Sequence, residues 1–368
     1  MLRIFVAQIM LKSSLFQLKI ELKMEKNNKQ ILEYISKNPL SSSKEIHEGS
    51  ELDIGYATVK RLLTRLEKNN YISIEGRGRG TKYNISLAYS ITKPIDPKEY
   101  FTKEIDEREI KDEFDLELIP NILNQIELFT QEELQNLENL QNTYNQKLKD
   151  LTNSQYQKEL ERLAIDLSWK SSQIEGNTYS LLETERLLKE QETAEGKNKD
   201  EATMLLNHKA ALDFILENPD YIDPVEIRRI EDIHSILIED LGVDRNIRSR
   251  SVGIIGTNYK PLDNAYQIRE ALQHMCNLVN SKKNVFEKAL LLLVLLSYIQ
   301  AFNDGNKRTA RIVSNACLIS SNYCPISFRT IDSVEYKKAM LIFYEQNNIS
   351  ILKNIFINQF EFAVKTYF

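Results

Sequence analysis

The feature that most constrains the fold is an almost continuously apolar stretch, Glu287 to Ile299, that runs directly into a charged loop broken by glycine. A helix that is apolar on every side offers no face to water, so it has to be buried among other elements. Nearly everything from Gln155 onward has helical character, and further helices are expected over residues 223–242, 306–321, 334–347 and 351–367. The sequence therefore predicts a mainly α protein whose central helix delivers the loop.

The loop that follows has the composition of an anion-binding turn. Gly305 allows a positive φ, so that successive N–H groups can form a concave nest. Asp304 supplies a hard carboxylate of the kind that Mg²⁺ prefers. Arg308 and Arg311 lie three residues apart and share a face of the next helix, whose N-terminus also favours negative charge. Together these residues predict a loop that closes on a nucleotide triphosphate.

The stretch from Phe302 to Arg311 resembles the signature of the Fic (Fido-fold) family, His-x-Phe-x-(Asp/Glu)-Gly-Asn-(Gly/Lys)-Arg-x-x-Arg. The resemblance covers roughly residues 155–368 and implies a Fic/Fido helical bundle with a β-hairpin flap. The implied reaction transfers AMP from ATP to a Ser, Thr or Tyr hydroxyl of a protein. The resemblance implies these roles: Mg²⁺ coordination by Asp304, the α-phosphate held by Asn306 and the amides around Gly305, the β-phosphate by Arg308, the γ-phosphate by Arg311, and added positive charge from Lys307.

One position departs from the signature, because Gln300 stands where the family has its catalytic histidine. A carboxamide can orient a hydroxyl group but cannot accept its proton, and loss of a general base costs about 10² to 10⁴ in rate. Phosphoryl-type transfers with loose transition states demand less of a base, so a weakened transferase stays open. The alternative is a catalytically deficient Fic domain that senses a nucleotide.

A second motif, Ser171 to Asn177, resembles the family's inhibitory helix, (Ser/Thr)-x-x-x-Glu-(Gly/Asn). We expect this helix over residues 160–176, with Ser171, Glu175 and Gly176 at the motif positions. Glu175 is expected to pair bidentately with Arg311. A carboxylate in the place of the γ-phosphate would leave ATP in an unproductive pose, which predicts self-inhibition.

The exception to the helical pattern is a β-prone segment punctuated by glycine, from Ser251 to Tyr259. It is expected to form a short hairpin and resembles the flap with which the family pairs its target polypeptide as an added strand. The residues implied for target docking are Val252, Gly253, Ile254, Ile255, Gly256 and Thr257. A purely structural hairpin is the alternative.

Residues 24–92 have the pattern of a winged helix. A helix ends at Lys37, Ser43 is expected to cap a second helix, and a third follows from Tyr56 to Asn69, before two strands that flank a glycine-rich turn. From residue 55 to 85 there are seven basic and two acidic side chains, a net charge of +5. Such a charge suits DNA, with Lys60, Arg61, Arg77 and Arg79 as the expected contacts. A winged helix used only for protein contacts is the alternative.

Between the two domains, residues 93–153 are expected to form a linker and a helical segment, and residues 154–368 the Fic/Fido domain. The stripe Leu137, Leu140, Tyr144, Leu148 and Leu151 is typical of a packed helix face, in the core or in a homodimer contact.

The composition predicts a globular, water-soluble chain, with 42% hydrophobic and 27% charged residues and a net charge of −5. Three cysteines without metal-type spacing suit a reducing cytoplasm, and the absence of a long apolar run indicates no membrane partner. Residues 1–23 are interpreted as a poorly ordered start, with Met24 as the beginning. The expected partners are therefore Mg-ATP, a protein hydroxyl and DNA.

Two hypotheses remain at this point. The first is a self-inhibited adenylyltransferase with weakened proton transfer. The second is a ligand-responsive transcriptional regulator, in which the Fic core binds ATP and the winged helix binds DNA.

Overall fold

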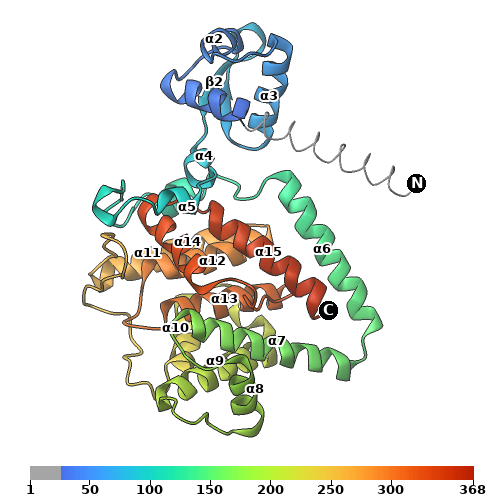
Figure 1. The fold of residues 1–368 in the computed structure, drawn as a ribbon, viewed down its shortest axis with the longest axis vertical. Coiled ribbons are helices and arrows are strands. Elements are labelled where there is room, and N and C mark those ends of the chain that lie inside the picture. Colours follow the sequence, from blue (N-terminus) through green and yellow to red (C-terminus); the bar gives the residue numbers. More distant parts are fainter. Residues whose placement is uncertain (1–25) are drawn as a thin grey trace, which may run out of the picture. The chain divides into compact units, whose positions relative to one another are not determined.

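The computed structural model describes residues 26–368, except for the side chain of Arg79. The chain forms two compact units that divide between Ser90 and Ile91 (Figure 1). The start predicted for residues 1–23, and Met24 itself, lie outside the described residues.

The first unit contains helices and a two-stranded hairpin in the predicted order. A helix over 26–37 is followed by α2 (Ser43–Gly49), α3 (Tyr56–Lys68), β1 (Ile72–Glu75), the 3₁₀ turn η1 (Gly78–Gly80) and β2 (Lys82–Ile85). The strands pair antiparallel, with Ile72 opposite Ile85. The cap of α2 is Ser42, one residue before the expected Ser43. Its hydroxyl accepts the Glu45 amide, and the Glu45 carboxylate accepts the Ser42 amide.

The helix α3 shows how this unit is held together. Its apolar residues recur at three- and four-residue steps, and Val59, Leu62, Leu63 and Leu66 are all buried against the first helix and the hairpin. The opposite side of α3 presents its basic residues to solvent. Burial of one helix face against a small sheet therefore fixes which side chains remain available at the surface.

The second unit is almost entirely helical, as predicted. Its main helices are α6 (Gln131–Asp150), α7 (Asn153–Ile174), α8 (Leu181–Glu190), α9 (Lys199–Glu217), α10 (Ile227–Leu237), α11 (Ala265–Ser281), α12 (Val285–Ile299), α13 (Asn306–Ser320), α14 (Ser333–Gln346) and α15 (Ser350–Thr366). Shorter elements are α4 (Leu87–Thr92), which crosses the division between the units, α5 (Pro97–Tyr100), η2 (Ile105–Glu107), the π-helical turn η3 (Leu118–Ile122) and η4 (Pro219–Ile222).

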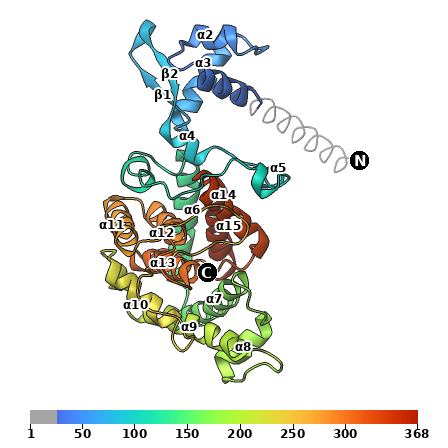
Figure 2. The same cartoon turned by 90° about the vertical axis from the view of Figure 1, so that its left-hand side faces the viewer.

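Within this unit α12 is the central helix. It lies among α11, α13, α14 and α15 (Figures 1 and 2). Every side chain from Ala289 to Ile299 is buried, as expected for a helix with no polar face. The C-terminal end of α12 leads into the charged loop, and α13 begins directly after it.

The stretch that was expected to link two domains is itself packed into the second unit. Phe114, Leu118, Leu123 and Phe129 are buried, because apolar residues recur through this irregular region. The helix α6 contacts α15, and the Lys147 ammonium donates to the Val364 carbonyl at 3.0 Å. Leu137 and Tyr144 of the predicted stripe are buried in this way, which favours the interpretation of the stripe as core.

Two local expectations differ from the structure. The helix expected over 223–242 is the shorter α10, because Asp223 and Pro224 lie in a turn with a cis peptide bond and the chain turns again after Leu237. The expected hairpin at 251–259 has a turn at Ile255 and Gly256, but its arms do not pair with each other. They are held by contacts to other elements, which are described below.

Over residues 26–368, none of the helices combines the length and the apolar character that crossing a bilayer would need.

Candidate functional site

The charged loop is shaped by left-handed backbone at both of its ends. Gln300 ends α12 with φ 52°, and Gly305 begins α13 with φ 80°. A Cβ on Gly305 would lie 3.2 Å from an Ile238 methyl group and 3.4 Å from the His234 ring. Glycine is therefore required at position 305 both by the backbone conformation and by the space around it.

His234 of α10 supports this loop. Its imidazole Nε2 lies 3.0 Å from the Asp304 carbonyl oxygen, and its ring stacks on Phe302 with centroids 3.6 Å apart. Burial lowers the pKa of His234 to about 4, so the ring is neutral near pH 7. His234 was not among the residues predicted from the sequence, since no spacing connects it with the loop.

Asn306 braces the same turn. Its side-chain carbonyl accepts the Phe302 amide at 2.8 Å, and its side-chain amide donates to the Phe302 carbonyl at 2.7 Å. The carboxamide is thus engaged with the loop backbone, and its contact with an α-phosphate stays a prediction. What remains for an anion at this position is the backbone N–H at the start of α13.

Arg308 is buried and holds the loop against α10. Its guanidinium donates to the Leu237 carbonyl at 3.2 Å and to the Asp304 carboxylate at 3.1 Å. The side chain of Asp304 is 63% exposed, whereas that of Arg308 is 1% exposed. Arg308 therefore presents Asp304 at the surface of the site.

Arg311 and the inhibitory motif meet as the sequence predicted, but with a different geometry. Arg311 donates through Nε to the Ser171 hydroxyl at 2.8 Å and through one terminal nitrogen to Glu175 Oε1 at 2.9 Å. The other oxygen of Glu175 lies 3.4 Å from the Lys307 ammonium. The expected bidentate Glu175–Arg311 pair is therefore wrong. The carboxylate is shared between two cations, because Ser171 occupies part of the guanidinium fork.

Glu175 is ionised in this arrangement. Burial alone would raise the pKa of its carboxyl, but Arg311 and Lys307 outweigh burial and hold the pKa below its usual value. Glu175 follows the last turn of α7, and Gly176 turns the chain away with φ 103°. All three residues of the predicted inhibitory motif thus lie at one helix end, where Ser171 and Glu175 contact side chains of α13.

Gln300 points away from the loop that it precedes. Its side-chain amide donates to the Ser297 carbonyl at 2.7 Å and lies 3.3 Å from the Tyr344 hydroxyl. Its backbone carbonyl accepts Arg248 Nε at 2.6 Å. Arg248 and Tyr344 were also missed from the sequence, because both act through contacts distant along the chain.

The site keeps unused donors that suit an anion. Arg308 Nε and a terminal nitrogen of Arg311 are buried and find no partner among residues 26–368. Gly305 offers no side-chain cap to the N-terminal amides of α13, which therefore favour negative charge. Glu175 is the anion that faces this cluster in the structure.

A divalent metal fits the site only through Asp304 and a bound anion. In the part of the chain that the structure describes, no group of three or more histidine, cysteine, aspartate or glutamate side chains could hold a metal ion. Mg²⁺ commonly binds through one or two carboxylates together with substrate phosphates. The exposed Asp304 carboxylate is consistent with that mode of binding.

The flap residues Val252 to Thr257 form an extended arm and a turn within the helical unit. Burial alternates along the arm: Ser251, Gly253 and Ile255 are exposed, while Val252 and Ile254 are half-buried. No backbone-to-backbone hydrogen bond to the described chain involves residues 251–256. Ile255, at the turn, is 97% exposed. The arm therefore has the alternation of a strand and an unpaired edge.

The basic residues predicted to contact DNA belong to the first unit. Lys60 and Arg61 are exposed on α3, and Arg77 is exposed before η1. The side chain of Arg79 lies outside the described part of the structure. These residues thus form a surface separate in sequence from the loop around Gly305.

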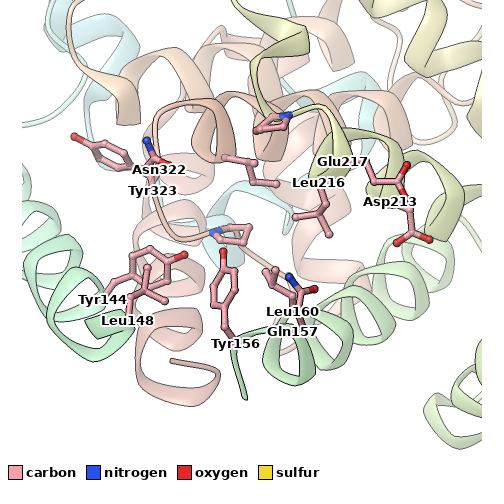
Figure 3. Close-up of a pocket in the computed structure, with 13 residues that line it drawn as sticks. Tyr144, Leu148, Tyr156, Gln157, Leu160, Asp213, Leu216, Glu217, Asn322 and Tyr323 are labelled. Carbon is pink, nitrogen blue, oxygen red and sulfur yellow. The ribbon is translucent and has the colours of Figure 1, made fainter. Parts of the chain in front are cut away.

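A cavity of about 430 Å³ lies elsewhere in the helical unit (Figure 3). Residues of α6, α7 and α9 line it together with the segment after α13, and Tyr144 and Tyr156 direct their hydroxyl groups into it. None of the predicted site residues lines this cavity. The chemistry predicted from the sequence therefore belongs to the loop and not to this pocket.

Fold and site together define a helical protein in which a buried helix leads into a charged loop, and a carboxylate at the end of a neighbouring helix pairs with cations that follow this loop. Residues 224–318 match the Fic/DOC family model. Curated relatives are "Protein adenylyltransferase Fic" of Aedes aegypti, 29% identical over 161 residues (42% of this chain, 32% of that protein), and of Nematostella vectensis, 30% identical over 179 residues (46% and 40%). The chain thus matches about a third to two-fifths of these relatives' length.

Solved structures show the same fold. "Fic-1 (aa134 - 508)" of Caenorhabditis elegans aligns over 64% of this chain and 72% of that chain, with a TM-score of 0.56 and 20% identity. A Fic domain containing signaling protein from Bacteroides thetaiotaomicron aligns over 63% and 93%, with a TM-score of 0.53 and 20% identity. Residues 224–318 thus match the Fic/DOC family model, and the helical unit has the fold of these Fic structures.

Proposed function

We propose that this chain is a self-inhibited protein adenylyltransferase that transfers AMP from Mg-ATP to a protein Ser, Thr or Tyr hydroxyl. The observation that carries the proposal is the shared ion pair of Glu175 with Arg311 and Lys307 beside the uncapped start of α13. Arg311 and Lys307 pair with no other carboxylate among residues 26–368, so Glu175 would occupy the place suited to a terminal phosphate.

In this proposal the chain's own residues bind and orient the triphosphate. Once Glu175 withdraws, Arg311 and Lys307 are free to bind phosphate oxygens, and the N-terminal amides of α13 face the charge that develops at the α-phosphorus. Asp304 would hold Mg²⁺, which neutralises phosphate charge when bound. His234 and Asn306 keep the loop in place throughout, because both bind its backbone.

The transfer itself forms a bond from the target oxygen to the α-phosphorus and breaks the bond to the bridging oxygen, so pyrophosphate leaves. The hydroxyl proton leaves to solvent, since Gln300 cannot accept it. Its carboxamide is also directed to Ser297 and Tyr344. We therefore expect a low rate even after inhibition is relieved.

The flap would position the target. Its arm has alternating exposure and an unpaired edge, and an extended peptide can add to such an edge through main-chain hydrogen bonds. Val252 to Thr257 would then set the register of the hydroxyl.

The orientation of Gln300 also favours a second candidate, a nucleotide sensor coupled to DNA binding. A side chain bonded back to its own helix contributes little to proton transfer, whereas the phosphate-binding groups are intact. The exposed Lys60, Arg61 and Arg77 would supply phosphate contacts to DNA, with Arg79 as a further expected contact.

One experiment separates the candidates. Transfer of labelled AMP to protein is measured for the unchanged chain, for Glu175→Gly, and for Glu175→Gly combined with Gln300→His. The control combines Glu175→Gly with Gln300→Asn, which disturbs the same packing without supplying a base. Histidine tolerates the positive φ at position 300, so we expect about 10² to 10⁴ faster labelling with Gln300→His than with Gln300→Asn.

Labelling by Glu175→Gly alone supports the enzyme. Labelling only with Gln300→His, together with ATP-dependent retention of duplex DNA by the unchanged chain, supports the sensor. Absence of ATP binding in every variant would defeat both candidates.

A further inference from the structure

The flap is held in place by a segment that lies earlier in the chain than residues 224–318, the region that matches the family model. We call residues 104–113 the strap. Arg108 of the strap donates to the Gly256 carbonyl at 3.0 Å, and the Asp106 carboxylate accepts the Asn258 side-chain amide at 3.2 Å. The Asp112 carbonyl accepts the Lys260 amide at 2.8 Å, where the two segments form a parallel bridge. The strap thus follows the C-terminal arm of the flap over several residues.

Arg108 is the buried member of these contacts. Its side chain is 3% exposed, and one terminal nitrogen lies 3.1 Å from the Glu345 carboxylate while the other binds Gly256. The guanidinium also lies over the Phe101 ring, 5.2 Å from its centroid. Tyr100 donates its hydroxyl to the same carboxylate at 2.6 Å. The fork of Arg108 therefore joins the end of α14 to the turn of the flap.

The flap depends on such contacts because its own arms do not pair. A β-hairpin normally fixes its turn through its own ladder, and that ladder is absent over the described residues 251–259. The turn rests on α14, where a Cβ on Gly256 would lie 3.3 Å from Leu341. Besides this contact with Leu341, the bond from Arg108 to the Gly256 carbonyl restrains the turn.

We propose that Arg108 is a positioning residue that sets the flap for its target polypeptide. A peptide that adds to the free arm needs that arm in one register, and the bond from Arg108 to Gly256 restrains the turn from which the arm extends. The target-docking part of this inference rests on the proposed function. The restraint of the flap by the strap does not.

The main test uses Arg108→Lys in the full chain. Lysine keeps a positive charge beside Glu345 but has no fork with which to bind both Glu345 and Gly256. We expect amide hydrogen exchange at the C-terminal end of the flap to accelerate roughly tenfold or more, at Tyr259 and Lys260, whose N–H groups donate to the Thr257 hydroxyl and to the Asp112 carbonyl of the strap. Exchange in α12 and α13 is expected to stay unchanged.

Lys103→Gln is the matched control, because it removes an exposed charge just before the strap. A second variant, Arg108→Gln with Glu345→Gln, removes the buried pair together and so leaves no lone buried charge. We expect fast exchange of the flap in this double variant and unchanged exchange in the control.

A functional measurement follows in the Glu175→Gly, Gln300→His background. Arg108→Lys is expected to slow self-labelling from labelled ATP by roughly tenfold while the Kd for ATP changes less than twofold. Unchanged exchange of the flap, or acceleration throughout the helical unit, would overturn the restraint. Accelerated exchange with undiminished labelling would overturn the positioning role, whereas absence of ATP binding would count against the proposed function alone.

Discussion

Two helices of this protein, α3 and α13, begin in similar ways, but their basic side chains lie in opposite environments. Both have glycine as N-cap without a side-chain cap, and both carry basic residues within their first two turns. On α3, Lys60 and Arg61 are exposed. On α13, Arg308 and Arg311 are 1% and 0% exposed. The comparison shows that surrounding helices, and not the local sequence, decide whether such cations are surface charges or fixed donors.

The physical consequence is a difference in specificity. A buried guanidinium has lost its hydration and needs partners in fixed positions, which Ser171, Glu175 and Leu237 provide. An exposed guanidinium keeps its water and contributes attraction that salt screens. The loop of α13 is therefore suited to one ligand geometry, and the α3 surface to a polyanion.

The largest difference is expected when the arginines themselves are removed. Arg311→Met leaves the Glu175 charge with only Lys307, so we expect a loss of about 3–5 kcal/mol in the free energy of unfolding. Arg61→Met, its matched control on α3, should change this free energy by about 0.5 kcal/mol or less. Urea denaturation followed by circular dichroism measures both. Equal losses would break the comparison.

The two N-cap glycines sharpen the comparison at the backbone. Gly305→Ala places a side chain at φ 80° and close to Ile238, so we expect a loss of about 1–3 kcal/mol. Gly55 has φ −68°, and a Cβ at this position would meet no atom within 4 Å. Gly55→Ala should therefore stay within about 0.5 kcal/mol. Thermal denaturation of the two variants tests this, and a larger loss at Gly55 would contradict it.

Acidification should lower the free energy of unfolding because His208 is buried near the same arginines, and the expected effect is smaller. His208 is buried near Arg311 and Arg308, and burial lowers its pKa well below the usual value. As the pH falls, the unfolded chain therefore binds a proton at this histidine before the folded chain does. The free energy of unfolding thus keeps its full contribution from neutral His208 above about pH 6.5 and decreases below that pH. Each pH unit below 6.5 costs at most about 1.4 kcal/mol per such histidine.

The measurement compares the free energy of unfolding at pH 7 and pH 5 for the unchanged chain and for His208→Gln. His234, with a pKa of about 4, acts in the same direction, so the variant should retain part of the pH dependence. An identical pH dependence in both proteins would show that His208 does not titrate on unfolding.

Much of the fold could be predicted because local sequence patterns indicate which residues form helices and strands and which faces are buried. The apolar run that became α12 and the periodic face of α3 report burial directly, whereas only Ile72 of the alternating β1 residues is buried. The failures lie where the chain departs from these patterns. Pro224 lies in a turn instead of opening a helix, and residues 93–130 pack into the core without a regular period.

The candidate site divides in the same way. The sequence placed Asp304 and Gly305 in one loop, and Arg308 and Arg311 at the start of the helix after it, because they are neighbours along the chain. It could not show that Asn306 binds its own loop or that Glu175 shares its oxygens with Lys307. It also could not show His234, Arg248, Tyr344 and Arg108, because each acts on the site from a distant part of the chain.

By itself, the amino-acid sequence determined which residues form helices, where the charged loop falls and which family signature it carries. These properties depend on neighbours within a few turns, and helical periodicity records them. Only the tertiary structure decided which arginines are buried, where Gln300 points and what holds the flap. Those properties depend on contacts between residues tens to hundreds of positions apart, and the local pattern contains no record of them.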